Sequence, residues 1–426
     1  MLGAVLLLAV IGFVAYRLLG SGFGGVGKTP ITWWGLWEDE TIVQPIIDEY
    51  EAANPGVEIN YVNQSNQDYR ERLANALSKE GGPDIFRFHN SWVPMLGRNL
   101  DSIPASVMST ADFTKTFYPV ASSDLSTGSG IVGIPLEHDA LTLFINEDIF
   151  QQNNKTTPTT WDDLRQTAIE LTTKDEREVI TQAGVALGRT ENVDHWPEIL
   201  GLMMLQNGAN PANPTNELAE DALNFFTVFS RQDGVWDETM PPSTTAFAAG
   251  KVAMYFAPSW RVFEIERQNP DLNYRTVELP QLPKATESEP DVSYATYWVE
   301  GVNAQSQSKE EAWKFLDYLS QAETLQKLYQ RQASIRAFGE PYPRIDMANL
   351  LSNHPAIGSI IRLAPDAESW YLASRTFDGP TGLNTQLADY YGDAINAVNQ
   401  GTDASKALQT AAQGINQVLS QYQVQR

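Results

Sequence analysis

The chain contains no cysteine, and it has only four histidines among 426 residues. Disulfide bonds, thiol catalysis, cysteine-ligated zinc and lipid attachment through a cysteine are therefore excluded. Basic residues are also scarce, since 29 Lys and Arg stand against 53 Asp and Glu, which gives a net charge of −24. A polyanion is repelled by such a surface, so we expect no nucleic acid among the partners.

Motifs of common enzymes are missing as well. Neither G-x-S-x-G nor H-E-x-x-H occurs, and the histidines are scattered along the chain. Residues 22–29 do match the phosphate-binding pattern G-x-x-x-x-G-K-[ST], but Pro30 and a strand-like segment follow. A phosphate-binding loop requires a helix at the Lys-Thr pair, so we interpret the match as a product of glycine-rich composition. We predict no enzyme activity, no cofactor and no metal site.

The N-terminus carries a continuous apolar run. MLGAVLLLAVIGFVAY is closed by Arg17, and it has neither the basic start nor the small-residue cleavage site of a secretory signal. With the two leucines that follow, it approaches the roughly 20 residues that span a membrane. We predict a membrane anchor over residues 1–20 and a flexible Gly-rich linker over 21–30. A cleaved signal and a buried helix or strand are the alternatives.

Alternating strands and helices predict the fold class of the remaining chain. The β-rich ITWWGLW is followed by the helical pattern EDETIVQPIIDEYEAA, the strand VEINYV, a helix over about 67–79 and the strand DIFRFH. This order predicts an α/β fold in which crossover helices connect a parallel sheet. The length predicts two or three domains. Further expected elements are a strand near 140–145, helices at 191–206 and 215–231, a strand at 252–256 and an amphipathic helix at about 403–422.

Four segments resemble one protein family in their order and spacing. They are DEYEAANPGVEINYV, GGPDIFRFHNSW, GIPLEHDALTLFINEDIF followed by TPTTWDDL, and AFAAGKVAMYFAPSW followed by KFLDYLSQAETLQKL. Through them the chain resembles the extracellular solute-binding proteins of ATP-driven (ABC) importers, in the sugar-binding group that includes maltose-binding protein. The C-terminal helices fit this pattern loosely.

The resemblance implies a two-lobe, periplasmic-binding-protein-like fold. Each lobe has a mixed or parallel sheet flanked by helices, and the chain crosses a hinge three times. One implied lobe comprises 31–138 and 293–338, and the other comprises 139–292 and 339–426. The ligand then lies between the lobes, which agrees with binding at the carboxyl ends of strands in α/β sheets. Many relatives attach through a lipidated cysteine, which this chain lacks, so its attachment departs from the family pattern.

A neutral sugar offers flat C–H faces and rings of hydroxyls, so its site needs aromatic rings beside carboxylates, amides or an arginine. Loops that follow the expected strands or cross between the lobes supply such side chains. The candidates from position are Trp37, Glu38, Asn90, Trp92, His138, Trp196, Trp298 and Trp370. The resemblance adds Asp139, where relatives often carry a ligand-binding carboxylate, Trp260, where they often stack an aromatic ring, and Arg336, where a residue often faces the cleft.

Packing is the alternative for each of these tryptophans, because an indole ring usually belongs to a core. Trp33 and Trp34 alternate along a strand, so at least one should point into the core. Trp161 follows Thr160, the expected N-cap of a helix, and we expect Trp161 and Trp313 to pack.

The acidic run after the first strand also has two interpretations. Glu38, Asp39 and Glu40 are expected to be charges in the first turn of a helix, where they complement its dipole. The alternative is that one of them accepts a hydrogen bond from a ligand hydroxyl.

The resemblance implies a protein that captures a carbohydrate outside the cell and delivers it to the permease subunits of an ABC importer. We expect a monomer in an extracytoplasmic location, tethered to the membrane by its N-terminus. Acidic loops with aromatic rings suit a polyamine or another cation almost as well as a sugar, and a peptide is a further alternative. A glycoside hydrolase with two carboxylates in the cleft is the enzymatic alternative.

Overall fold

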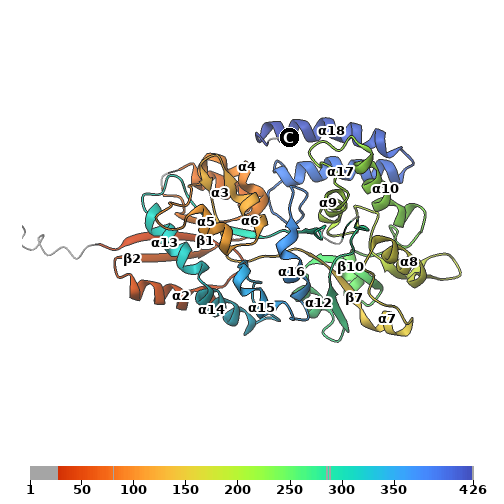
Figure 1. Cartoon of the computed structure of the whole chain (residues 1–426), viewed down its shortest axis with the longest axis horizontal. Helices are drawn as coiled ribbons and strands as arrows, with labels where there is room; N and C mark the ends of the chain where they lie inside the picture. The colour runs from red at the N-terminus through yellow and green to blue at the C-terminus, as the bar shows by residue number, and fades with distance from the viewer. Residues whose placement is uncertain (1–26, 80, 285, 287–288, 425–426) are drawn as a thin grey trace, which may run out of the picture.

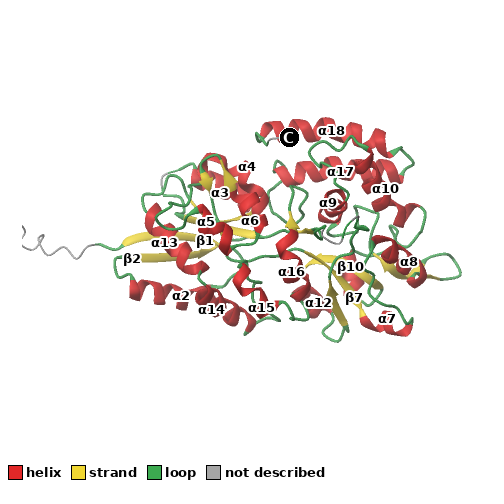
Figure 2. Cartoon of the chain, in the orientation of Figure 1, coloured by secondary structure: helices red, strands yellow, loops and turns green. Residues whose placement is uncertain are grey.

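Two five-stranded β-sheets lie one after the other along the long axis of the molecule, and helices cover each of them (Figures 1 and 2). The computed structural model describes residues 27–79, 81–284, 286 and 289–424. The predicted anchor at 1–20 and most of the predicted linker lie outside these residues. Within the described part of the chain, no helix is long and apolar enough to cross a membrane.

The first sheet has five strands. Their order is β2-β1-β3-β13-β6, which are Val57–Asn63, Thr29–Gly35, Ile85–His89, Trp298–Val302 and Ile134–Pro135. β1 is parallel to β2 and β3, whereas β13 is antiparallel to β3 and β6. The predicted parallel β-α-β-α-β unit is confirmed, and a strand from much later in the chain completes the sheet. Because Thr29 already belongs to β1, no helix begins at the Lys-Thr pair of the phosphate-binding pattern.

Local sequence explains the first crossover helix. α2, Glu40–Ala53, begins after Asp39, whose carboxylate accepts a hydrogen bond from the amide of Thr41 (2.9 Å). One face of α2 is buried, as its helical spacing of apolar residues indicates. The other helices around the first sheet are α3 (Tyr69–Leu77), α4 (Val93–Leu96), α5 (Thr110–Thr116), α6 (Pro119–Leu125), α13 (Lys309–Ser320) and α14 (Ala322–Ala333).

The second sheet also has five strands. Their order is β11-β7-β10-β9-β8, which are Tyr274–Val277, Leu141–Asn146, Val252–Pro258, Ile180–Val185 and Thr173–Lys174. β10 is parallel to β9 and antiparallel to β7, and β7 is antiparallel to β11. β7 and β10 are buried at every position, because they lie inside the sheet and are covered on both faces.

Helices from two parts of the chain cover the second sheet. The first set is α7 (Glu147–Gln152), α8 (Trp161–Leu171), α9 (Trp196–Gln206), α10 (Glu217–Arg231), α11 (Ser243–Ala248) and α12 (Arg261–Gln268). The second set is α16 (Gly358–Leu363), α17 (Leu383–Asn399) and α18 (Ala404–Gln421). α17 and α18 pack on each other and on α10 (Figure 1). Helix α9 begins later than the expected residue 191, with Pro197 in its first turn, where a missing N–H costs no helical hydrogen bond.

The chain passes between the two sheets at three places. β6 leads to β7, β11 leads to β13, and α14 leads through the short α15 (Ala348–Leu351) to α16, which packs on β7 and β11. A later segment joins the second of these crossings, because β14 (Ala367–Glu368) pairs with β12 (Ser293–Tyr294). The connection between the sheets is therefore partly a paired ribbon.

A buried arginine joins three segments of the first sheet. Arg87 on β3 has Nη1 2.6 Å from Oε2 of Glu38 and Nε 2.7 Å from Oε1 of Glu300 on β13. Glu300 also accepts a hydrogen bond from Nε1 of Trp33 (3.1 Å), and Arg87 donates to the carbonyl of Leu36 (3.0 Å). All three charged side chains are buried, so each depends on the others for compensation.

The acidic run divides between two roles as a result. Glu40 lies in the first turn of α2, as expected, whereas Asp39 lies one residue before that turn, as the N-cap. The prediction that Glu38 is a charge of that first turn is wrong, because its carboxylate turns inward to pair with Arg87. Trp33 is buried, which agrees with its expected position in the core.

Replacing Arg87 with Met should destabilise the fold strongly, because Glu38 and Glu300 would remain buried without their counter-ion. Loss of one partner of a buried ion pair costs about 3–5 kcal/mol. Urea unfolding followed by circular dichroism measures this. Lys314→Met removes exposed ion pairs with Glu310 and Glu311, and it should cost less than about 1 kcal/mol. Equal losses in the two variants would contradict the assignment.

Candidate ligand-binding site

Four rings gather at the ends of β1, β3 and β13. Trp298 lies at their centre, with ring centroids 5.9 Å from Trp37, 5.5 Å from Trp92 and 5.3 Å from His89. We call these four residues the first aromatic cluster. Trp92 and His89 are buried and Trp298 is half-buried, whereas Trp37 is 45% exposed. Trp37 is therefore the ring of this cluster that is most accessible to a ligand.

Sheet topology brings these rings together. β1 and β3 are parallel, so their carboxyl ends lie at the same edge, and Trp37 and Trp92 follow those ends by two and three residues. β13 runs in the opposite direction, and its first residue, Trp298, pairs with His89 at the end of β3. Trp37 has a φ of 72°, which a bulky side chain rarely adopts.

A second group of side chains surrounds Trp260, which follows β10. The guanidinium carbon of Arg261 lies 4.4 Å from the centroid of the Trp260 ring, and the rings of His195 and Trp260 meet edge to face at 5.6 Å. Nε of Arg261 donates to Nε2 of His195 (2.8 Å), whose Nδ1 lies 3.1 Å from Oγ of Ser374. Ser374 donates to Oε1 of Glu198 (2.8 Å). We call Arg261, His195, Ser374 and Glu198 the arginine network.

Burial and charge set the protonation of this network. Burial lowers the pKa of His195, and Arg261 adds to that effect, although Glu198 opposes it. Burial alone would raise the pKa of Glu198, but its hydrogen bonds and the nearby His195 lower it below the usual value. Among the described residues, Nη2 of Arg261 and Oε2 of Glu198 are buried without a hydrogen-bond partner. The network thus places an arginine and a carboxylate around a neutral imidazole.

The arginine network does not have the geometry of a catalytic triad. In a triad, an unprotonated histidine nitrogen faces the serine hydroxyl and an acid holds the other nitrogen. Here Nε2 of His195 accepts from Arg261, so the proton of the neutral ring is on Nδ1, which faces Ser374. The network therefore orients side chains. Within the described ranges, no group of three or more acidic or histidine side chains is placed to hold a metal ion.

Asp139 lies in the first crossing and holds the loop that leads to Trp260. Its Oδ1 accepts from the amides of Ala140 (2.7 Å) and Ser259 (3.0 Å), and its Oδ2 accepts from Oγ of Ser259 (2.9 Å). Burial raises the pKa of Asp139 to about 7, although these hydrogen bonds act in the opposite direction. In this conformation the carboxylate positions Ser259, which directly precedes Trp260.

His138 and Asn90 are also buried among protein groups. The ring of His138 lies 5.0 Å from Tyr118 and 6.0 Å from Tyr297, and burial lowers its pKa to about 4. Nδ2 of Asn90 donates to Oδ2 of Asp124 (2.9 Å), which also accepts from the hydroxyl of Tyr297 (2.8 Å). In this conformation His138 packs between the first two crossings and the start of α6, and Asn90 joins the end of β3 to α6.

The remaining predicted residues lie in other surroundings. The guanidinium of Arg336 lies 4.8 Å from the centroid of the Phe263 ring. Trp196 begins α9 and is half-buried against the core. Trp370 contacts the ring of Tyr391 at 6.2 Å. The structure thus groups Trp37, Trp92 and Trp298 into one cluster, places Trp260 in another, and pairs Glu38 with Arg87.

Sequence reasoning did not select three members of the arginine network. Arg261 directly follows Trp260, so a charged residue beside a candidate stacking ring was an available signal. Glu198 lies three residues after His195, at a spacing that brings side chains together at a helix start. Ser374 had no local signal, because its role comes from contact with Glu198, 176 residues earlier.

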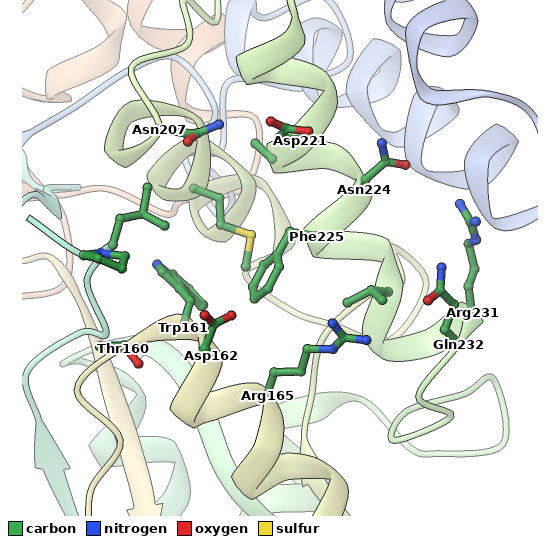
Figure 3. Close-up of a pocket in the computed structure, with 15 residues that line it drawn as sticks. Thr160, Trp161, Asp162, Arg165, Asn207, Asp221, Asn224, Phe225, Arg231 and Gln232 are labelled. Carbon is green, nitrogen blue, oxygen red and sulfur yellow. The ribbon is translucent and has the colours of Figure 1, made fainter.

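A cavity of about 430 Å³ lies elsewhere, between α8, α9 and α10 (Figure 3). Its apolar lining includes Trp161, Met203 and Phe225. Trp161 is buried and stacks on Phe256 at 5.5 Å, which agrees with its expected packing role. None of the predicted ligand-binding residues lines this cavity, so we place the candidate site at the two aromatic groups instead.

The chain belongs to the bacterial extracellular solute-binding protein family. The model of that family matches residues 35–325, which is more than half of the chain. The predicted family resemblance is therefore confirmed. The family consists of binding proteins that act outside the cytoplasm.

Solved structures of similar proteins share the two-lobe fold. The cyclic α-maltosyl-1,6-maltose binding protein of Arthrobacter globiformis is 17% identical, with 93% of this chain and 100% of that chain covered and a TM-score of 0.74. The sugar-binding protein MalE of Xanthomonas citri is 19% identical, with coverages of 93% and 98% and a TM-score of 0.74. A cyclo/maltodextrin-binding protein complexed with maltotetraose is 16% identical, with coverages of 92% and 97% and a TM-score of 0.73. At these identities the likeness confirms the predicted fold.

Replacing Asp139 with Asn should change how stability depends on pH. Because the folded pKa of about 7 exceeds the usual value, the folded state keeps a proton that the unfolded state releases between about pH 4 and pH 7. This contribution to stability is present at low pH and is lost as the pH rises through 7. The wild type should therefore lose stability relative to Asp139→Asn between about pH 4.5 and 7.5, measured by urea unfolding.

Asp39 provides the control with the opposite sign. The Thr41 hydroxyl and amide lower the pKa of this exposed carboxylate. Asp39→Asn should therefore not gain stability relative to the wild type as the pH rises. A pH-independent difference between the wild type and Asp139→Asn would contradict the raised pKa of Asp139.

Proposed function

We propose that the protein binds a carbohydrate between its two lobes and delivers it to the permease subunits of an ABC importer. The observation that carries this proposal is a pair of accessible indole rings, Trp37 and Trp260, that follow strands of different sheets beside polar side chains. Such rings stack on the C–H faces of a sugar, while carboxylates, amides and arginine bind its hydroxyls. Two of the three similar structures are named for maltose-type oligosaccharides and the third as a sugar-binding protein, which supports the same ligand class.

We infer the extent of the lobes from the strands. All five strands of the second sheet fall within residues 139–292, and those of the first sheet fall within about 29–138 and 293–338. This supports 31–138 with 293–338 as lobe 1, and 139–292 with 339–426 as lobe 2. Closure of the two lobes on the ligand is the mode of capture that we propose.

We further propose that the protein works as a monomer tethered outside the cytoplasm. The apolar run at 1–20 supports a membrane anchor. The predicted linker at 21–30 is two residues too long, because β1 already begins at Thr29, so we propose residues 21–28 as the linker. The chain lacks the cysteine that would carry a lipid, and an apolar N-terminal segment replaces that function. The permease is then the partner to which both lobes are presented.

A polyamine or another organic cation is the second candidate ligand. The net charge of −24 attracts cations, and indole faces bind them through cation–π contacts. In the described structure, however, Arg261 lies over the Trp260 ring. A fixed positive charge at that ring opposes a cationic ligand, so the observation favours a neutral sugar. A peptide and a glycoside hydrolase activity rank below both.

A titration of tryptophan fluorescence tests the ligand class. Maltotetraose and other neutral oligosaccharides should change the emission of the wild type, because exposed Trp37 and half-buried Trp260 leave water on binding. Micromolar affinity corresponds to about 8 kcal/mol. Spermidine and amino acids should leave the emission unchanged. A response to spermidine without any response to sugars would indicate that the ligand is a cation and not a carbohydrate. Turnover of a glycoside panel would indicate an enzyme.

Trp260→Ala and Trp37→Ala should each weaken sugar binding about tenfold or more, because each removes a stacking face, and buried aromatic anchors contribute most of the binding free energy. Isothermal titration calorimetry measures the affinity, and circular dichroism checks the fold. Trp34→Phe is the control, since Trp34 is half-buried in β1 and packs on the core. Unchanged affinity in Trp37→Ala or Trp260→Ala would remove that residue from the site.

A further inference from the structure

Left-handed backbone geometry occurs at Trp37 of the first aromatic cluster and at two residues of a later segment that contacts it. Trp37, Arg375 and Phe377 have φ angles of 72°, 59° and 55°. Such angles are uncommon for large side chains, and they persist only where surrounding contacts hold them. The rings of Trp37 and Phe377 also touch, with their centroids 5.6 Å apart. Backbone strain is therefore concentrated where two distant segments meet.

Residues Ser374–Asp378, which we call the strap, are held at both ends. At one end, the amide and hydroxyl of Ser374 donate to Oε1 of Glu198 on α9, at 2.6 and 2.8 Å. At the other end, the carbonyl of Asp378 accepts from Nε of Arg70 on α3. Because α9 belongs to the half built on the second sheet and α3 to the half built on the first, the strap connects the two halves.

The Asp378 end is fixed a second time by the start of α17. Oδ2 of Asp378 accepts from the amide of Asn384 (2.7 Å), and its Oδ1 accepts from Oγ1 of Thr385 (2.6 Å). The side chain of Asp378 is buried. Two of the three residues between the fixed ends, Arg375 and Phe377, adopt the left-handed geometry. The strap therefore has little freedom to relax while both ends remain attached.

Two residues of the strap connect to the two accessible indole rings, one directly and one through a neighbouring side chain. Phe377 lies against Trp37, whose other ring contact is Trp298 at 5.9 Å. Ser374 contacts His195, which holds Arg261 over the Trp260 ring. The exposed guanidinium of Arg375, between them, lies only 3.6 Å from the carboxylate of Asp194.

We propose that the strap is a positioning element that sets the orientation of Trp37 and Trp260 before the ligand arrives. Phe377 and Ser374 are its positioning residues, and neither needs to touch the ligand. Strain in the strap holds the Phe377 ring against Trp37, which reduces the entropy lost when a rigid sugar ring stacks there. This inference rests on the proposed function for the identity of the ligand, but the contact between Phe377 and Trp37 can be tested without any ligand.

The ligand-free test uses fluorine NMR of protein labelled with 5-fluorotryptophan, in which the Trp37 resonance is identified by its loss in Trp37→Phe. Phe377→Leu should shift and sharpen that resonance, because the Trp37 ring loses the aromatic ring that packs against it. Phe225→Leu replaces another half-buried phenylalanine, on α10, and should leave the resonance unchanged. An unchanged Trp37 resonance in Phe377→Leu would overturn the proposal, whatever the ligand is.

The ligand test uses maltotetraose and calorimetry. Phe377→Leu should weaken binding about threefold to tenfold, the range expected for loss of one aromatic pair. In a Trp37→Ala background the same substitution should have no further effect, because Phe377 acts through Trp37. Additive losses, or wild-type affinity in Phe377→Leu, would overturn the positioning role. If the wild type itself binds no sugar, the proposed function fails. The resonance test still shows whether the strap positions Trp37.

A pair of substitutions at Arg375 tests the role of strain. Both Arg375→Ala and Arg375→Gly remove the charge, but only glycine adopts the left-handed geometry without cost. Arg375→Gly should therefore unfold roughly 1–2 °C higher than Arg375→Ala, yet bind maltotetraose more weakly, because the strap is looser. Tighter or equal binding by Arg375→Gly would contradict a strained positioning element.

Discussion

The burial of one guanidinium is the constraint on which the first half of the molecule depends. Arg87 lies in the interior of the first sheet, so carboxylates must be brought to it, and they come from β13 and from the turn after β1. Glu38 is drawn inward immediately after Trp37, and the backbone at Trp37 turns through the left-handed region. The most exposed ring of the first aromatic cluster is thus placed by the electrostatic requirement of its neighbour.

The second half repeats this arrangement with the opposite charge. Trp260 is half-buried, and the next residue, Arg261, is buried and hydrogen-bonded to His195. Asp139 fixes the loop on the other side of Trp260 through Ser259. In both halves an indole ring is oriented by buried polar groups one residue away, which is how a rigid stacking surface is built at the end of a strand. The paired ribbon β12–β14 and the strap connect these two halves.

Much of the fold could be predicted from the sequence, but little of the site. The parallel β-α-β-α-β unit and the cap at Thr160 follow from local periodicity and capping chemistry, and the structure has them. The four ordered segments indicated the family, which the family model confirms. Local reasoning misplaced Glu38 because its partner Arg87 is 49 residues away, and it did not find Ser374 because Glu198 is 176 residues away. Contacts between such distant residues leave no periodic pattern in the sequence.

The sequence by itself determined the class of protein and the types of side chain available to bind a ligand. Alternating strands and helices predict an α/β fold, and the order of four segments resembles the extracellular solute-binding family. Only the tertiary structure decided which tryptophans pack in the core and which leave a ring face accessible to a ligand. That choice depends on burial, and burial depends on where charged partners from distant strands compensate one another. Trp33 and Trp37 lie four residues apart, yet one is in the core and the other is 45% exposed.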